Sequence, residues 1–481
     1  MQLFCEVVGV NLQSFTTCEL AYRLRTNDVQ VRDVVQATLD RIAQTNPQIN
    51  ALCHVSDRSQ LAQSVEESTL RLRSGKPRSW LEGVPISVKD NLWVKDMPAS
   101  WGSEVFRNLV ANVDDPPVGD VRNAGALIVG KSNTPELALA GITDNRLHGV
   151  TRNPWNLNVT PGGSSGGAAA SVSSGQTTVA LATDAGGSIR RPSAYTGTVG
   201  LRPTTGLFSR PHGFPSTTLD LQVVGPIART VADCALLVQS VASSPSLSNL
   251  LCDNGEGLVF QPTDMTGKRV RIYVDEAIPH DQGVLQALHD VADCIRECGL
   301  RVDRGDLPLD IEEVDKCWAT LIAAGTAHAL EHRDMAVESL TPLIRGLRER
   351  GLALTASEVF STAGALLDMR HTSRLMWQSC DFLLAPASPC VAWAIGQGAP
   401  ITIAGTPVGP RAAARYAPFV NVMGAPAIVL PWTVDQFGLP IGIQIVAAPW
   451  RDAELLALAA KVERCAPIAD RLIAKQTADY V

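Results

Sequence analysis

Short apolar segments that alternate with helical patterns constrain the fold of this 481-residue chain most strongly. Residues 83–89 and 124–130 are each short, apolar and rich in β-branched residues, as buried strands are. Helical periodicity covers residues 17–45, and helical segments also lie between and after the two apolar segments. This alternation predicts an α/β protein whose sheet carries helices on both faces.

Residues 161–206 are rich in glycine, serine and threonine, a composition that by itself would indicate a linker. The segment contains a helical stretch at 168–172 and an apolar strand at 179–183, so we interpret it as structured rather than as a flexible tether. Later elements are expected as helices at 284–294 and 319–336, a strand at 441–446, and a final helix capped by Asp452.

Charge balance and cysteine usage exclude several classes of protein. The chain has 41 Lys and Arg against 48 Asp and Glu, a net charge of −7, and no basic block, so no nucleic-acid partner is expected. Its 11 cysteines follow no repeated spacing, which disfavours a secreted disulfide framework. The first residues lack the positive region of a signal peptide, and no run of about 18 apolar residues occurs. A cytoplasmic protein with no membrane partner is therefore predicted.

Three segments match known motifs whose usual function does not fit their context. Residues 125–132 match the phosphate-loop pattern, but their middle residues form the expected strand, followed by a turn at Lys131. Residues 328–332 have the histidine spacing of an inverted zinc-hydrolase motif, but no third ligand follows, so two solvated helix-surface histidines are expected. Residues 162–166 match the nucleophile elbow of α/β-hydrolases, although a poor strand containing Pro161 precedes them, and we keep this as a minor alternative.

Three polar segments together carry the chemistry: Lys89 at the end of an apolar strand, residues 162–167 and residues 184–190. With the sequence around them, from 83 to 229, they resemble the amidase signature family, and weaker similarity reaches both ends of the chain. The resemblance implies the family's fold: one large α/β/α sandwich around a central mixed, mostly parallel β-sheet.

By position, the resemblance implies a catalytic triad in which Ser188 is the nucleophile, Ser164 a bridging serine after a cis peptide bond, and Lys89 the base. A serine hydroxyl is a poor nucleophile unless a base removes its proton, and no histidine lies beside either serine in the sequence. A lysine acts as a base only when neutral, which requires burial and nearby positive potential. We expect the apolar strand to bury Lys89, and a helix starting near 166–168 to direct its positive end at the site.

The backbone N–H groups of Ala185, Gly186, Gly187 and Ser188 are predicted to form the oxyanion hole. Glycine and alanine leave these consecutive donors almost free of side-chain obstruction.

Five further positions near these segments have assigned roles. Asp184 and Arg190, which flank the nucleophile, are expected to form a structural ion pair. The resemblance places Ala138 and Ala140 in the lining of a substrate-binding acyl pocket, although core filling is an equal alternative. Arg191 stands where the glutamyl-tRNA amidotransferase A subunit usually has glutamine, which disfavours that role.

The whole chain, residues 1–481, is interpreted as one amidase domain. Its expected regions are N-terminal helices (1–75), a catalytic core (76–235), a variable substrate-side region (240–410), and a C-terminal strand and helix (411–481).

The predicted function is hydrolysis of a carboxylic amide to an acid plus an amine or ammonia through a serine acyl-enzyme. Small or aromatic substrates are favoured, with carbamates as a further class. The alternative is an ammonia-producing protein, similar to the glutamyl-tRNA amidotransferase A subunit, that works in a complex. A non-catalytic binding module is disfavoured because all three triad residues are present. The expected partner is a small-molecule amide, a homodimer is also considered, and this chemistry requires no metal or organic cofactor.

Overall fold

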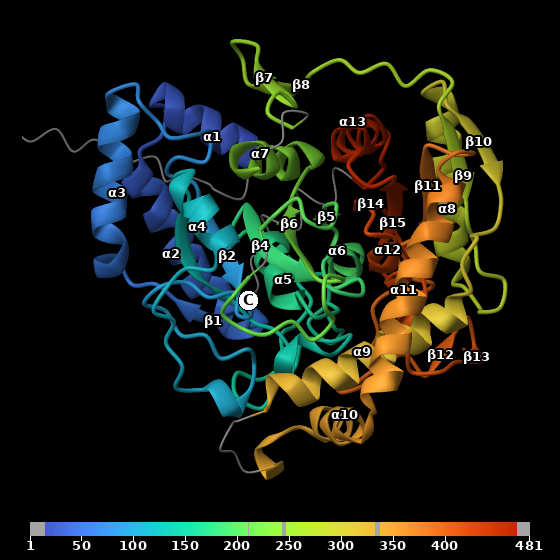
Figure 1. Cartoon of the computed structure of the whole chain (residues 1–481). Helices are drawn as coiled ribbons and strands as arrows, with labels where there is room; N and C mark the ends of the chain where they lie inside the picture. Colours follow the sequence, from blue (N-terminus) through green and yellow to red (C-terminus); the bar gives the residue numbers. More distant parts are fainter. Residues whose placement is uncertain (1–14, 210, 243–246, 332–336, 469–481) are drawn as a thin grey trace, which may run out of the picture.

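An 11-stranded sheet runs through the described part of the computed structural model, residues 15–209, 211–242, 247–331 and 337–468 (Figure 1). Its strands, in spatial order, are β1 (Leu52–Val55), β3 (Leu127–Ser132), β2 (Pro85–Lys89), β4 (Val179–Asp184), β6 (Val223–Ala228), β5 (Val199–Arg202), β14 (Ala427–Val434), β15 (Pro440–Ala447), β11 (Phe382–Pro386), β9 (Arg269–Ile272) and β10 (Arg301–Arg304). Two small hairpins lie outside it, β7 (Leu251–Asp253) with β8 (Leu258–Phe260), and β12 (Thr402–Ile403) with β13 (Thr406–Pro407).

The sheet is mixed. Strands β3, β2 and β4 are parallel neighbours, and so are β11, β9 and β10. The strands between these two blocks pair antiparallel, and β1 pairs antiparallel with β3 at the edge. The predicted α/β class with a large mixed sheet is therefore confirmed, with its parallel pairing concentrated in the two blocks.

Helices cover both faces of the sheet. They are α1 (Thr17–Thr26), α2 (Val31–Ile49), α3 (Arg58–Arg73), α4 (Pro116–Asn123), α5 (Gly166–Ser173), α6 (Arg190–Thr196), α7 (Val231–Val241), α8 (Gln282–Glu297), α9 (Ile311–Ala329), α10 (Pro342–Ala353), α11 (Ala356–Met376), α12 (Pro418–Met423) and α13 (Asp452–Glu463).

Alternate residues of the strands belong to different apolar cores, because successive side chains of a strand point to opposite faces. In β4, Val179 and Leu181 pack into the core that contains α1, α2, α4, α7, α8 and α13. Ala180 and Ala182 pack against α5 on the other face, where separate clusters also hold residues of α6, α9, α11 and α12. This arrangement is the predicted sandwich.

Two predicted helix boundaries are wrong. The helical pattern at 17–45 is divided, because Asn27 ends α1 in the left-handed conformation (φ 65°) and α2 begins only at Val31. Asp452 does not cap the last helix: it is the first residue of α13, and its carboxylate accepts hydrogen bonds from the backbone and hydroxyl of Thr204. The first break is a local left-handed cap, whereas the second depends on a residue far away in the sequence.

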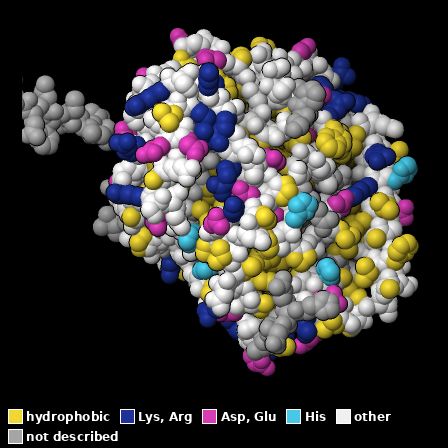
Figure 2. Space-filling view, turned by 60° about the vertical axis from the view of Figure 1, so that its left-hand side comes forward, with side chains coloured by type: hydrophobic (Ala, Val, Ile, Leu, Met, Phe, Trp, Pro, Cys, Tyr) yellow, Lys and Arg dark blue, Asp and Glu magenta, His cyan; other side chains and the backbone are white. Residues whose placement is uncertain are grey.

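The expected helix at 319–336 is α9, and residues 332–336 lie outside the described residues. Among the helices of the described ranges, none combines the length and the apolar character that a membrane span requires. Every cysteine in the described part of the chain is a free thiol. On the face drawn in Figure 2, Lys and Arg side chains are interspersed with Asp and Glu side chains.

Candidate active site

The predicted catalytic segments meet at one edge of the sheet. The parallel strands β2 and β4 end at Lys89 and Asp184, so the residues that follow them lie side by side. Residues 162–165 lead into α5, and the contacts of Lys89 place them at the same edge. The peptide bond between Gly163 and Ser164 is cis.

Lys89, Ser164 and Ser188 form a continuous line of hydrogen bonds. Lys89 Nζ lies 2.8 Å from Ser164 Oγ, which lies 2.9 Å from Ser188 Oγ. Lys89 is fully buried and Ser164 is 1% exposed, whereas Ser188 is partly exposed. The structure thus brings the three residues together, with Lys89 buried and Ser188 partly exposed; their catalytic roles stay predictions.

Burial lowers the pKa of Lys89 to about 7, although the negative charge of Asp184 opposes part of this effect. In the described part of the chain no carboxylate pairs with the Lys89 ammonium. The N-terminal end of α5 lies beside the amine, as expected, because Lys89 Nζ contacts Ser165, the residue before the helix, at 2.9 Å. A large share of Lys89 is therefore neutral at physiological pH.

Three hydroxyl groups surround Lys89 Nζ: Ser164 Oγ at 2.8 Å, Ser165 Oγ at 2.9 Å and Thr183 Oγ1 at 3.1 Å. Ser165 Oγ donates to the Thr183 carbonyl at 3.1 Å, so it accepts from Lys89. Thr183 Oγ1, 3.1 Å from Lys89 Nζ, also accepts from Asn91 Nδ2. Ser165 and Thr183 thus accept two N–H groups of Lys89, and the contact with Ser164 Oγ, at 2.8 Å, is the one through which a neutral amine would accept a proton.

Asp184 holds the turn that carries Ser188. Its carboxylate accepts from the N–H groups of Gly187 and Ile189, at 2.9 and 3.1 Å, and from Arg190 Nε and Nη2, at 3.1 and 3.0 Å. Burial alone would raise the pKa of Asp184, but the Arg190 guanidinium and these hydrogen bonds hold it well below its usual range. The expected ion pair is present, and its carboxylate is ionised.

The predicted oxyanion hole needs a correction at Gly187. Its N–H is occupied by Asp184 Oδ1, so it is not free to stabilise a substrate oxygen. The N–H groups of Ala185, Gly186 and Ser188 have no protein acceptor within the described ranges. Three of the four predicted donors therefore stay available.

The predicted pocket residues lie in different settings. A Cβ atom built on Gly163 would lie 2.8 Å from the carbonyl oxygen of Ala140, so Ala140 packs beside the serine segment. Arg191 Nη2 donates to the Gly163 carbonyl at 2.9 Å. Ala138 is half-buried and packs against an apolar cluster that includes Phe214. Their contact with substrate stays a prediction.

The structure can be compared with the three motif matches at residues 125–132, 162–166 and 328–332. The expectation for the first of them is wrong in one detail. Residues of the phosphate-loop match form β3, as expected, but Lys131 lies within this strand and not in a turn. No strand directly precedes residues 162–166: the described residues 151–161 contain only isolated bridges, between Asn153 and Asn156 and between Val159 and Ala394. His328 is an exposed residue of α9, and His332 lies outside the described residues.

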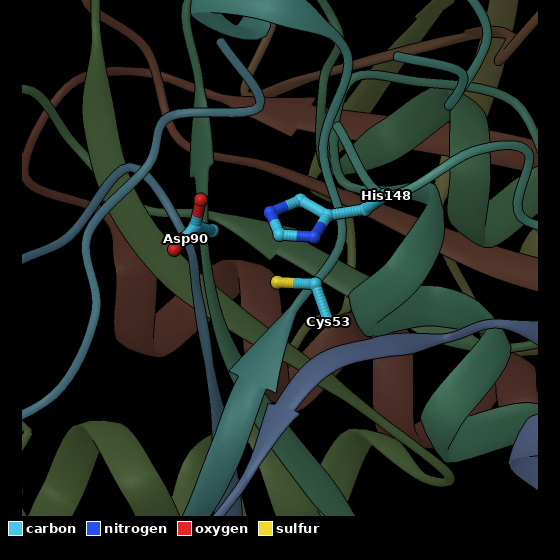
Figure 3. Close-up of side chains that lie close together, drawn as sticks. All are labelled: Cys53, Asp90 and His148. Atoms are coloured by element: carbon cyan, nitrogen blue, oxygen red, sulfur yellow. The ribbon is translucent and has the colours of Figure 1, made fainter. Parts of the chain in front are cut away.

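A second polar cluster lies next to the site, where Cys53, Asp90 and His148 turn toward one another (Figure 3). Their ligand-type atoms all lie within 4.8 Å of each other. The fully buried Lys131 ammonium lies 3.4 Å from Asp90 Oδ1, and the Cys53 thiol donates to the Lys131 carbonyl. Ser100 Oγ bonds both Asp90 and His148. Lys131 thus supplies the positive charge that a metal ion would supply, and we interpret the cluster as a structural ion-pair network.

The structure is therefore that of an α/β protein in which one lysine and two serines meet where the parallel strands β2 and β4 end. The sequence model of the family described as Amidase matches residues 33–456. The chain therefore belongs to the amidase signature family, as its sequence predicted.

Relatives and solved structures agree with this membership. The chain is 31% identical over 471 residues to the glutamyl-tRNA(Gln) amidotransferase A subunit of Lawsonia intracellularis, covering 90% of this chain and 94% of that protein. The protein of the same name from a Cyanothece species is 28% identical over 484 residues, with 94% and 98% covered. A bacterial aryl acylamidase of the amidase signature family superposes with a TM-score of 0.85 at 25% identity, over 97% of this chain and 99% of that chain.

Proposed function

We propose that the protein hydrolyses a carboxylic amide to an acid plus an amine or ammonia through an acyl-enzyme on Ser188. The observation that carries the proposal is the hydrogen-bonded line from buried Lys89, with its pKa lowered to about 7, through Ser164 to the hydroxyl of the partly exposed Ser188. A neutral amine joined to a hydroxyl in this way can accept its proton while that hydroxyl attacks a carbonyl carbon.

In the acylation step, Ser188 Oγ attacks the amide carbon, its proton passes to Ser164 Oγ, and the Ser164 proton passes to Lys89. The negative charge that develops on the carbonyl oxygen is stabilised by the free N–H groups of the 185–188 turn, where one donor is worth about 3 to 4 kcal/mol. Return of the proton through Ser164 to the leaving nitrogen breaks the C–N bond and leaves the acyl-enzyme. Water then attacks the ester by the same relay and releases the acid.

Small or aromatic carboxylic amides are the proposed substrates, with carbamates as a further class. The similarity to an aryl acylamidase supports this choice, because that protein's name describes cleavage of aryl amides. The chemistry described for Lys89, Ser164 and Ser188 needs no metal or organic cofactor.

The curated relatives favour a second candidate function. Both are named as the A subunit of a glutamyl-tRNA(Gln) amidotransferase, so an ammonia-producing member of a complex is the alternative. Arg191, in place of the usual glutamine, weighs against it.

Assay of the purified chain by itself separates the two candidates. We expect turnover of simple anilides by a protein that elutes from gel filtration with no partner, because the whole proton relay lies within this chain. Anilides, primary amides, ureas, carbamates and glutamine would be screened in parallel. Hydrolysis of glutamine alone, or activity only after a partner is added, would instead support the amidotransferase function.

A further inference from the structure

Trp318 of α9, in the variable region of the chain, reaches the turn that carries Ser188. Its indole Nε1 donates a hydrogen bond to the Ala185 carbonyl at 3.1 Å. A Cβ atom built on Gly186 would lie 2.7 to 3.0 Å from three atoms of the indole, so the ring occupies the place of a side chain there. One side chain thus holds both residues of the Ala185–Gly186 peptide.

The bond to the Ala185 carbonyl determines where the next N–H points. In a planar trans peptide the C=O and the following N–H point in opposite directions, and the Gly163–Ser164 bond is the cis exception in the described residues. The Gly186 N–H is therefore directed away from Trp318. Turning this peptide over would break the indole hydrogen bond and bring a carbonyl oxygen where the free donor now lies.

The neighbouring peptides of the turn are held in the same way. Asn421 Nδ2 donates to the Asp184 carbonyl at 3.2 Å, and the Arg191 N–H donates to the Gly187 carbonyl at 2.8 Å. These contacts orient the N–H groups of Ala185 and Ser188. Each free donor of the turn is thus preceded by a carbonyl with a fixed partner, and Trp318 is the partner from the variable region.

Trp318 is itself fixed. The Arg411 guanidinium lies over the indole, 4.1 Å from the ring centroid, and Arg411 Nη2 pairs with Asp315 Oδ1 at 2.6 Å. Asp315 lies three residues before Trp318 on α9, on the same side of the helix. The indole is therefore held between α9 and the segment before α12.

We propose that Trp318 is a positioning residue for amide hydrolysis, one that keeps the Gly186 N–H directed at the developing oxyanion. The inference rests on the proposed function. A residue of the variable region would thus act on the reaction indirectly, by orienting the backbone of the 185–188 turn.

The Trp318→Phe variant tests this inference, because it keeps an aromatic ring over Gly186 and removes the indole N–H. We expect kcat on an anilide to fall about 10-fold, while KM changes by no more than about twofold. The expected loss is smaller than the roughly 100- to 1,000-fold effect of removing a whole oxyanion donor, because the Gly186 N–H is misdirected and not removed. Phenylboronic acid provides a second readout: Ser188 Oγ adds to boron, and the resulting tetrahedral anion places an oxygen in the oxyanion hole. Its inhibition constant should weaken by the same factor, while inhibition by the carboxylic acid product stays unchanged.

Trp155→Phe is the matched control, since it removes an indole N–H bonded to another backbone carbonyl, that of Thr196, at 2.8 Å. This control should keep the parent's kcat and boronic acid affinity. Parental kcat and boronic acid affinity in Trp318→Phe would overturn the inference, as would equal losses in both variants. Absence of amide turnover in the parent would instead contradict the proposed function.

Discussion

The Ser188→Ala variant is expected to stay folded and to lose about 10,000-fold or more in kcat, since removal of a serine nucleophile has effects of that order or larger. Ser188 is the partly exposed end of the hydrogen-bonded line from Lys89, whereas Ser164 is 1% exposed. Steady-state hydrolysis of an anilide measures the loss. Intact-protein mass spectrometry after treatment with a fluorophosphonate should show no adduct.

Ser193→Ala is the control for this substitution. Ser193 is a buried serine five residues further along, and its hydroxyl donates to the Ile189 carbonyl, outside the relay. It should keep parental kcat and full labelling. Substantial turnover by Ser188→Ala, or an adduct on a different serine, would contradict the assignment of the nucleophile.

Replacing Lys89 with methionine is expected to lower kcat by about 1,000- to 10,000-fold. A general base usually contributes about 100- to 10,000-fold, and the expected loss lies in the upper part of that range. The variant should melt at the same temperature as the parent or higher. Lys89 is buried without a carboxylate partner, and burial lowers its pKa to about 7, so its charged form is costly to keep inside the protein. Anilide kinetics and thermal unfolding provide the two readouts.

Lys131→Met is the contrasting control, because Lys131 is equally buried but pairs with Asp90 at 3.4 Å. Its removal leaves a buried carboxylate without its cation and should destabilise the fold by about 3 to 5 kcal/mol. Lys131→Met should therefore lower the free energy of unfolding, whereas Lys89→Met should leave it unchanged or raise it. Parental kcat near neutral pH in Lys89→Met would show that the base lies elsewhere.

The site could be predicted from the sequence because its parts are local. Lys89 ends a short apolar strand and Ser188 lies in a turn of small residues, but it was the resemblance of the segments around them to the amidase signature family that assigned their roles. The three-dimensional meeting of these segments follows from the parallel pairing of β2 and β4, whereas the alternation of strands and helices indicated only an α/β sheet.

The remaining features depend on contacts between residues far apart in the chain. The Asp452 carboxylate bonds Thr204 instead of the end of α13, and nothing near Asp452 in the sequence indicates that partner. Trp318 belongs to a region without a recognisable motif, and its contact with Ala185 appears only in the folded chain. The engagement of the Gly187 N–H is more local, since Asp184 lies three residues before it, and an aspartate before a glycine turn is a signal for such a bond.

The rate at which a fluorophosphonate labels Ser188, followed by peptide mass spectrometry as a function of pH, tests the proton relay most directly. Ser188 Oγ displaces fluoride only when Lys89 can take its proton through Ser164, and the pKa of Lys89 is about 7. The account predicts one adduct, on Ser188, whose rate of formation rises about tenfold per pH unit below 7 and becomes constant above it. An adduct on another residue, or a labelling rate that does not change between acidic and alkaline pH, would contradict it.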